Sequence, residues 1–397
     1  MNSLSVLDQI IPDTSEQDAI ETAKLSSKLD FFNFTYEELS KLMMEKYSEP
    51  AYRARQLFEW AYKKWMHDPK LMTNITKNLR ESFADLFVFP KARIADRQIS
   101  SDGSRKYLLE LEKGDLVEAV MIKQPGRMTL CVSSQIGCGM GCKFCRTATM
   151  GFQRNLSTSE IIRQVMAVIE DAKNFDDMFS NIVFMGMGEP LHNFKGVIGA
   201  LKILTNAYAF KIGPRKITVS TVGLVPAIKK FAAAGMPASL AVSMNATTNE
   251  IRSEIMPINK NYPLEELLET LRAVPLKKRS RITIEYVMLK GVNDSPADLK
   301  RLASLLKNMQ VKINLIPYNE NAGLGYKQPS VENIRNWQEK LVAAGYSTTV
   351  RWSKGRDIDA ACGQLATKHQ EKKVSAVQAT IPQTLQQPAV KLEATAI

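Results

Sequence analysis

The stretch Cys138-Gly-Met-Gly-Cys142-Lys-Phe-Cys145 contains three of the five cysteines in the chain. Three residues separate the first two cysteines of this stretch, and two separate the last two. The spacing suits a cubic iron–sulfur cluster that takes three protein thiolates and leaves one iron open, whereas a closed structural zinc site needs a fourth protein ligand nearby. We therefore predict that Cys138, Cys142 and Cys145 bind a cluster, with structural zinc as the alternative.

This cysteine stretch directly follows a predicted strand at residues 128–133, where strands begin to alternate with helices. The later strands are predicted at residues 181–185, 216–220, 238–243, 281–289, 311–317 and 347–352. Helices between them begin with capping signals, such as Ser157 with Glu160 and Ser295 before Pro296. The alternation predicts an α/β fold with a parallel sheet, and about six strand–helix units suit an open, partial (β/α)6 barrel.

The chain has 397 residues and a net charge of +12, which is unevenly distributed. Residues 1–40 hold two basic and eight acidic residues, so this segment carries −6 and the remainder carries +18. A basic excess of this kind suits nucleic acid, because lysine and arginine release counterions from phosphates. A solvated basic surface would have the same composition, so charge alone leaves both interpretations open.

The N-terminal residues lack the basic-then-apolar layout of a signal peptide, and no apolar run has the length of a membrane span. We therefore expect a cytoplasmic protein that does not bind a membrane, with cysteines that serve as metal or redox ligands. Changes in composition and pattern divide the chain into five segments. They are a disordered acidic leader (1–29), a helical domain (30–90), a β extension (91–123), the barrel core (124–366) and a disordered tail (367–397).

The helical domain mixes basic and aromatic residues. Its first helix is predicted to start at Thr35, which with Glu38 forms a capping box. The basic residues are Arg53, Arg55, Lys63, Lys64, Lys70, Lys77 and Arg80, and the rings among them are Tyr52, Tyr62 and Trp65. Such interleaving suits RNA, where cations meet phosphates and rings stack on bases. An ordinary amphipathic bundle with a charged outer face is the alternative.

Polar and flexible residues follow several predicted strands at the edge where barrel enzymes place their chemistry. The second strand of the core ends in Met185-Gly186-Met187-Gly188-Glu189-Pro190, in which glycines allow close approach of a ligand and Glu189 offers a carboxylate to a cofactor ammonium. Three later strand ends carry Ser220, Ser243-Met244-Asn245 and Asn319. These hydroxyls and amides are candidates for holding the polar groups of a cofactor, although each alone would also suit a helix cap.

The motifs together resemble those of the RlmN/Cfr family of radical S-adenosylmethionine methyltransferases, and more closely those of its RlmN branch. The similarity spans roughly residues 30–366. Besides the cysteine stretch, it rests on Gly151-Phe-Gln-Arg-Asn-Leu156, Gly186-Met-Gly-Glu-Pro190 and Gly355-Arg-Asp-Ile-Asp-Ala-Ala-Cys-Gly-Gln-Leu365. Asn245 departs from the family pattern, in which histidine is frequent at this position.

The resemblance implies one 4Fe–4S cluster per chain, whose open iron binds S-adenosylmethionine through the cofactor's amino and carboxylate groups. Gly188, Glu189 and the polar strand ends are the implied cofactor contacts, and the helical domain is the implied RNA-binding domain. The implied reaction is methylation of carbon-2 of an adenosine in 23S rRNA, and in the dual-specificity branch also of the adenosine 3′ to certain tRNA anticodons. The resemblance further implies a monomer that receives electrons from a reductase such as flavodoxin.

Cys131 and Cys362 stand alone in the sequence, and each is a candidate reactive thiol. In the mechanism that the resemblance implies, Cys362 takes a methyl group from one S-adenosylmethionine, and a second molecule supplies the radical that activates this methyl group, so two are consumed per methylation. Cys131 then resolves the protein–RNA adduct by forming a disulfide with Cys362. Glu118 matches the position of a glutamate treated as the proton acceptor, which leaves Cys131 and Glu118 as alternative bases.

Two other functions fit the same residues. One is methylation of carbon-8 of adenosine, as in the Cfr branch, and we favour carbon-2 because the N-terminal half and Gly151-Phe-Gln-Arg-Asn-Leu156 look more like RlmN. The other is a non-catalytic RNA-binding protein whose three clustered cysteines hold zinc. Only three histidines occur, His67, His192 and His369, so sulfur rather than imidazole is expected to carry the chemistry.

Overall fold

The computed structural model describes residues 28–321 and 323–366. The predicted tail and nearly all of the predicted leader lie outside these ranges. Leu29 already pairs with Phe87 in a short parallel ladder, and Lys28 Nζ donates a hydrogen bond to the carbonyl of Ala84 over 2.7 Å. The structured part of the helical domain therefore reaches at least two residues ahead of the predicted boundary at residue 30.

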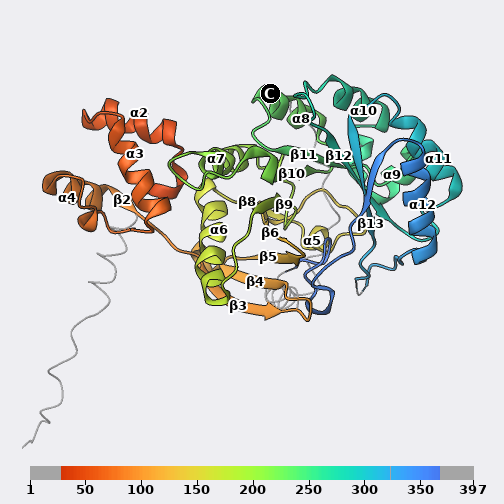
Figure 1. Cartoon of the computed structure of the whole chain (residues 1–397), viewed down its shortest axis with the longest axis horizontal. Helices are drawn as coiled ribbons and strands as arrows, with labels where there is room; N and C mark the ends of the chain where they lie inside the picture. Colours follow the sequence, from red (N-terminus) through yellow and green to blue (C-terminus); the bar gives the residue numbers. More distant parts are fainter. Residues whose placement is uncertain (1–27, 322, 367–397) are drawn as a thin grey trace, which may run out of the picture.

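The N-terminal domain is a small helical unit, coloured red to orange in Figure 1. Its elements are β1 (Leu29–Asp30), η1 (Phe31–Asn33), α2 (Tyr36–Tyr47), α3 (Tyr52–Phe58), η2 (Glu59–Lys63), η3 (Pro69–Leu71), α4 (Lys77–Leu86) and β2 (Phe87–Val88). The predicted capping box is confirmed, because the Glu38 N–H donates to Thr35 Oγ1 and the Thr35 N–H donates to a Glu38 carboxylate oxygen. Aromatic rings fill the core of the domain, and Tyr62 is only 3% exposed. Tyr62 is therefore a core residue and does not present its ring to RNA, whereas Tyr52 remains exposed.

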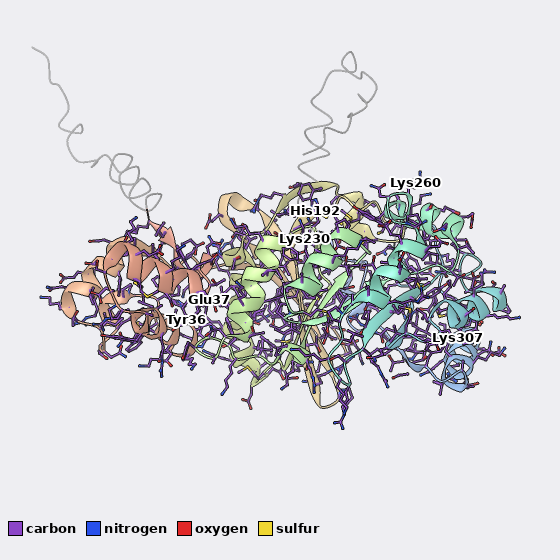
Figure 2. All side chains as sticks on the ribbon, turned by 90° about the horizontal axis from the view of Figure 1, so that it is seen from above. Tyr36, Glu37, His192, Lys230, Lys260 and Lys307 are labelled. Carbon is purple, nitrogen blue, oxygen red and sulfur yellow. The ribbon has the colours of Figure 1, made fainter. Side chains whose placement is uncertain are left out.

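The N-terminal domain packs against the outer face of the core. The Ser159 N–H in α6 (Thr158–Ala172) donates to Asn33 Oδ1 over 3.0 Å, and the ring centroid of Tyr36 lies 5.1 Å from that of Tyr208. Figure 2, which labels Tyr36 and Lys307, places the domain at one end of the molecule.

A ten-stranded sheet forms the core, in the order β14-β13-β12-β11-β10-β9-β6-β5-β4-β3. Three antiparallel strands, β3 (Arg93–Ile99), β4 (Arg105–Glu110) and β5 (Leu116–Gln124), extend one edge, and a turn at residues 101–103 joins β3 to β4. The parallel strands are β6 (Arg127–Val132), β9 (Asn181–Phe184), β10 (Ile217–Thr221), β11 (Ser239–Ser243), β12 (Ile282–Met288), β13 (Val311–Pro317) and β14 (Ser347–Val350). The predicted parallel α/β sheet is therefore confirmed.

Helices connect successive parallel strands and cover the outer face of the sheet (Figure 1). After α6 they are α7 (Phe194–Thr205), α8 (Val225–Ala233), α9 (Asn249–Ile255), α10 (Leu264–Ala273), α11 (Pro296–Leu305) and α12 (Val331–Ala343). Capping boxes start α6 at Ser157 with Glu160 and α11 at Ser295 with Asp298. None of the helices within the described residues is long and apolar enough to cross a lipid bilayer.

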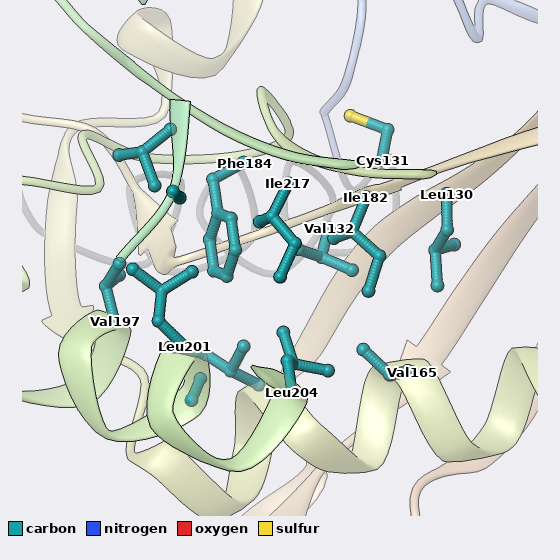
Figure 3. Close-up of a cluster of buried hydrophobic side chains, with 14 of the residues drawn as sticks. Leu130, Cys131, Val132, Val165, Ile182, Phe184, Val197, Leu201, Leu204 and Ile217 are labelled. Atoms are coloured by element: carbon teal, nitrogen blue, oxygen red, sulfur yellow. The ribbon is translucent and has the colours of Figure 1, made fainter. Parts of the chain in front are cut away.

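Side chains on β6 alternate between the two faces of the sheet. Figure 3 shows Leu130 and Val132 directed toward the helical layer that carries Val165 and Leu204, while the sulfur of Cys131 points to the opposite face. This alternation follows from the two-residue period of a strand. The strand therefore uses Leu130 and Val132 to anchor the helical layer and presents Cys131 to the interior of the barrel.

Candidate active site

Two cavities lie inside the barrel. The first, about 150 Å³, lies at the carboxyl ends of the parallel strands and is here called the carboxyl-end cavity. The second, about 440 Å³, is lined by residues nearer the amino ends of the same strands and is called the amino-end cavity. Four residues line both cavities: Met185, Glu285, Arg351 and Cys362. The two spaces therefore meet at a layer that contains one of the two lone cysteines.

The cysteine stretch lines the carboxyl-end cavity with all three of its thiols. It lies between β7 (Gln135–Gly137) and β8 (Phe152–Asn155), and the Cys138 N–H donates to the carbonyl of Gly151 over 2.9 Å. The pKa of Cys138 rises to about 12 because burial disfavours its thiolate. A cluster would remove this penalty, since metal binding deprotonates its thiol ligands.

The donor set of the carboxyl-end cavity fits an iron–sulfur cluster: three thiols share one wall of the cavity and converge with a buried carboxylate, Glu189. In residues 28–321 and 323–366, no three histidine, cysteine or acidic side chains meet as a single metal ion would require. Each thiolate of a cluster binds a different iron, so this finding does not bear on a cluster.

Glu189 is held at the end of β9 by a turn that requires glycine. Gly188 has a φ of 97°, and a Cβ added to it would lie 2.4 Å from Cβ of Gln135. The buried side chain of Gln135 accepts a hydrogen bond from the Glu189 N–H over 2.8 Å, and Glu189 Oε2 accepts one from the Val222 N–H over 2.9 Å. Burial raises the pKa of Glu189 to about 7, so a cationic ligand group would favour its ionised form.

The later strand ends contribute most of their predicted residues to the same cavity. Ser220, Ser243, Asn245 and Asn319 line it, and Asn245 takes a left-handed conformation with a φ of 55°. Met244 does not line it, because its side chain is only 1% exposed and belongs to the hydrophobic core. Met244 directly follows Ser243, the last residue of β11, and successive side chains along a strand point to opposite faces of the sheet. The predicted cofactor contact at Met244 is thus not one its side chain makes.

The two lone cysteines lie close to each other at the layer between the cavities. Cys362 lines both cavities, and Asn319 Nδ2 donates to its carbonyl oxygen over 3.1 Å. Cys131 lines the amino-end cavity only. Burial and, to a smaller extent, the nearby Cys362 raise the pKa of Cys131 to about 12, whereas Arg351 acts in the opposite direction. The fold therefore brings together two cysteines that are 231 positions apart in sequence.

Glu118 lies on β5 beside this layer. Its carboxylate is 3.7 Å from Lys106 Nζ, both side chains are buried, and its carbonyl accepts a hydrogen bond from Ser133 Oγ over 2.6 Å. Neither cavity is lined by Glu118. In this structure Cys131, and not Glu118, opens onto a space that a substrate can occupy.

Two charged residues of the shared layer were missed by the sequence reasoning. Ser220 Oγ donates to Glu285 Oε2 over 2.7 Å, and Arg351 Nη1 lies 3.9 Å from the other oxygen of Glu285. Arg351 Nη1 also donates to the sulfur of Met185 over 3.1 Å. A glutamate within an otherwise apolar predicted strand, at residues 281–289, was the available signal, because such a charge is buried only with a partner.

Comparisons with known proteins agree with this geometry. Residues 132–303 match the Radical SAM superfamily, and residues 29–88 match the ribosomal RNA large subunit methyltransferase N-terminal domain. A crystal structure of a radical SAM methyltransferase from Sphaerobacter thermophilus superimposes with a TM-score of 0.78 at 38% identity, over 85% of this chain and 98% of that one. The superfamily in general uses a 4Fe–4S cluster and S-adenosylmethionine, which suits the thiols and Glu189 of the carboxyl-end cavity.

Curated relatives extend the match over most of the chain. The dual-specificity RNA methyltransferase RlmN of Geotalea uraniireducens is 46% identical over 338 residues, which are 85% of this chain and 96% of the relative. The protein of the same name from Geobacter sulfurreducens is 44% identical over 344 residues, with 87% and 94% covered. The chain therefore belongs to the RlmN family of radical SAM RNA methyltransferases.

Proposed function

We propose that this enzyme methylates carbon-2 of adenosine in RNA through a methyl group carried on Cys362. The observation that supports this most directly is the position of Cys362 in the layer shared by both cavities. A thiol there faces a cofactor in the carboxyl-end cavity and a base in the amino-end cavity. A carrier of a one-carbon unit needs this access to both donor and acceptor.

The residues of the carboxyl-end cavity bind and orient the cofactor. Cys138, Cys142 and Cys145 would hold a 4Fe–4S cluster, which when bound supplies the electron that cleaves S-adenosylmethionine to methionine and a 5′-deoxyadenosyl radical. The carboxylate of Glu189 would pair with the cofactor ammonium. Ser220, Ser243, Asn245 and Asn319 would bind its remaining polar groups. We propose that each methylation uses two S-adenosylmethionine molecules, one as methyl donor to Cys362 and one as radical source.

Carbon-2 of adenine is electrophilic and carries no acidic proton, so transfer of a methyl cation to it has no nucleophile to use. In the proposed route, the methyl group on Cys362 loses a hydrogen atom and the resulting carbon radical adds to carbon-2, which links the RNA to the protein. The adduct gives its unpaired electron to a one-electron acceptor, and the Cys131 thiolate takes the carbon-2 proton. The sulfur of Cys131 then attacks the Cys362 sulfur and breaks its bond to the methylene carbon, which takes up the proton and becomes the methyl group, so that a disulfide forms and the methylated RNA leaves. A reductant must restore both thiols before the next cycle.

Cys131 is better placed than Glu118 to act as the base, because it opens onto the amino-end cavity while Glu118 faces Lys106. A protonated thiol cannot accept a proton, so this role requires the thiolate of Cys131, whose formation burial disfavours and Arg351 favours. Glu118 remains the alternative proton acceptor, one strand away.

The proposed substrates are an adenosine of 23S rRNA and an adenosine in some tRNAs. The relatives are named dual-specificity RNA methyltransferases, which is compatible with two kinds of RNA. The N-terminal domain supports RNA binding through Tyr52, whose exposed ring has the largely buried guanidinium of Arg53 4.8 Å from its centroid. We further propose that the enzyme acts as a monomer in the cytoplasm and receives electrons from a reductase of the flavodoxin type.

The test is in vitro methylation by anaerobically reconstituted enzyme, followed by nucleoside mass spectrometry. The expected product is 2-methyladenosine, and 8-methyladenosine would instead support the Cfr-like alternative. Cys362→Ala should abolish methylation of RNA and still release 5′-deoxyadenosine, which acts as an internal control for an intact cluster. Full methylation by Cys362→Ala would refute the carrier role. A colourless protein that contains zinc and no iron would support the non-catalytic alternative.

A further inference from the structure

The mouth of the amino-end cavity is strongly basic. Arg127, Arg215 and Lys312 line it near the amino ends of β6, β10 and β13, and all three are exposed to solvent. Lys354 adds a fourth cation from the segment after β14. Among the described residues that line this cavity, Glu285 is the single carboxylate, and it already bonds Ser220 and pairs with Arg351. The mouth therefore carries an excess of positive charge that would attract phosphates.

The interior of the amino-end cavity is polar rather than packed with branched aliphatic side chains. The polar neutral residues that line it are Thr129, Asn181, Thr218, Ser239, Thr283, Asn314 and Thr349. A closed barrel fills this space with layers of apolar side chains. A lumen of about 440 Å³ lined by hydroxyls and amides instead has the size and the hydrogen-bonding groups of a ligand site.

Cys131 opens into this cavity and not into the carboxyl-end cavity. A base that is to meet both Cys131 and Cys362 must therefore lie in the amino-end cavity. The carboxyl-end cavity has a volume of about 150 Å³ and is lined by the residues proposed to bind the cofactor. With the cofactor bound, it would leave little room for a second purine.

The amino-end cavity is also lined by an aromatic residue, Trp352. Trp352 lines the amino-end cavity two residues beyond the end of β14 and is 42% exposed. An exposed tryptophan next to cations is the arrangement on which single-stranded nucleic acids stack their bases. Duplex RNA would not present an unstacked base to this wall.

We propose that the amino-end cavity is the nucleotide site, so that the target adenosine enters the barrel from the end opposite to the cofactor. In this arrangement Arg127, Arg215, Lys312 and Lys354 bind phosphates of a single-stranded RNA segment, and Trp352 stacks on a base next to the target. The target adenosine is unstacked and reaches Cys362 from the amino-end side of the barrel. This inference rests on the proposed function and adds the route and the residues that recognise the RNA.

The first test removes charge from the mouth. The double variant Arg215→Gln/Lys312→Gln should weaken binding of a single-stranded RNA, and should reduce the slope of log K against log salt by about 1.4, because each lost phosphate contact contributes about 0.7. The matched control is Lys230→Gln/Lys307→Gln, which removes the same charge from the exposed outer helical layer, where Figure 2 labels both lysines. An unchanged slope in the mouth variant, or an equal loss in the control, would overturn the proposal.

The second test uses the ring. RNA should quench the fluorescence of Trp352, and Trp352→Ala should remove this part of the signal and weaken binding about tenfold or more, whereas Trp352→Phe should restore binding. Both sets of variants should cleave S-adenosylmethionine without RNA at the wild-type rate, because their residues do not line the carboxyl-end cavity. Failure of the proposed function would appear as a wild-type enzyme that makes no methylated RNA. Failure of this inference would appear as RNA affinity that changes neither in the Arg215→Gln/Lys312→Gln variant nor in the Trp352→Ala variant.

Discussion

The backbone N–H of Gly355 donates a hydrogen bond to Oδ2 of Asp102 over 2.8 Å, although 253 positions separate the two residues. A reciprocal contact lies beside it: Asp357 accepts hydrogen bonds from Ser100 Oγ and from the Ser101 N–H. The β3–β4 turn is thereby fastened to the segment that leads to Cys362. At the other end of this segment, the Arg146 N–H donates to the carbonyl of Gly363 over 2.8 Å.

These contacts predict that the β3–β4 turn positions Cys362 without touching substrate. Asp102→Ala/Asp357→Ala should loosen the segment, so that iodoacetamide alkylates Cys362 about threefold faster or more, since locally opened segments exchange more readily with solvent. Peptide mass spectrometry would follow the alkylation, and RNA methylation should fall in parallel. Asp96→Asn is the control, because that carboxylate contacts Arg97 and Gln98 of its own strand. Equal alkylation rates in the wild type and the double variant would rule out this positioning role.

Cys131→Ala should stop the reaction after the base has been linked to Cys362, because the thiol that resolves the adduct is missing. We expect an RNA-linked protein band on a denaturing gel, and the band should disappear when Cys362 is also replaced by alanine. Accumulation of the same adduct in Glu118→Gln, with normal resolution in Cys131→Ala, would assign the proton acceptor to Glu118 instead.

Glu160 should make stability depend on acid. Burial alone would raise its pKa, but hydrogen bonds from Arg154 and from the Ser157 N–H lower it below the usual 4.5. A carboxyl group with a lowered pKa in the folded state contributes its full stability above its unfolded pKa and loses it as pH falls through the folded pKa. Glu160→Gln should therefore lower the free energy of unfolding by about 1–2 kcal/mol at pH 7 and by much less near pH 3. Urea unfolding at both pH values measures the difference, with the exposed Glu266→Gln as control.

Leu201→Ala should destabilise the core. Its side chain is fully buried in the cluster that contains Phe184, Val197 and Leu204, between α7 and the sheet. Removing it leaves a cavity that the tightly packed helix and strand cannot close, so we expect a loss of about 2–5 kcal/mol in the free energy of unfolding. Leu71→Ala, at a site that is 54% exposed, should change the same quantity by less than about 0.5 kcal/mol. A loss as small at Leu201 would contradict the packing described.

The parallel sheet and its helix starts were predictable because local patterns encode them. Strand periodicity, the capping box at Ser157 and the cap at Ser295 before Pro296 depend on residues that are close in sequence, and the structure reproduces them. The cavity residues at the strand ends were predictable for the same reason, since parallel strands bring their carboxyl ends to one edge. Met244 was grouped with its neighbours without regard to strand alternation; because its side chain is buried in the core, a cofactor contact at this position would come from its backbone.

The rest of the site depends on distances that the sequence does not state. The partnership of Arg351 with Glu285 joins β14 to β12, and the contact of Asp102 with Gly355 joins two ends of the chain. No local pattern marks either pair. The burial of Tyr62 was missed for a related reason, because the interleaving of rings and cations does not say which rings fill the core.

The shared layer at Met185, Glu285, Arg351 and Cys362 separates the carboxyl-end cavity from the amino-end cavity, and the thiol of Cys362 lies between the two. If the RNA binds in the amino-end cavity as proposed, methionine and nucleoside can leave through the carboxyl-end cavity while the RNA stays bound. One RNA molecule can therefore remain bound while one S-adenosylmethionine molecule is replaced by the next. The RNA then does not have to dissociate and bind again within one methylation.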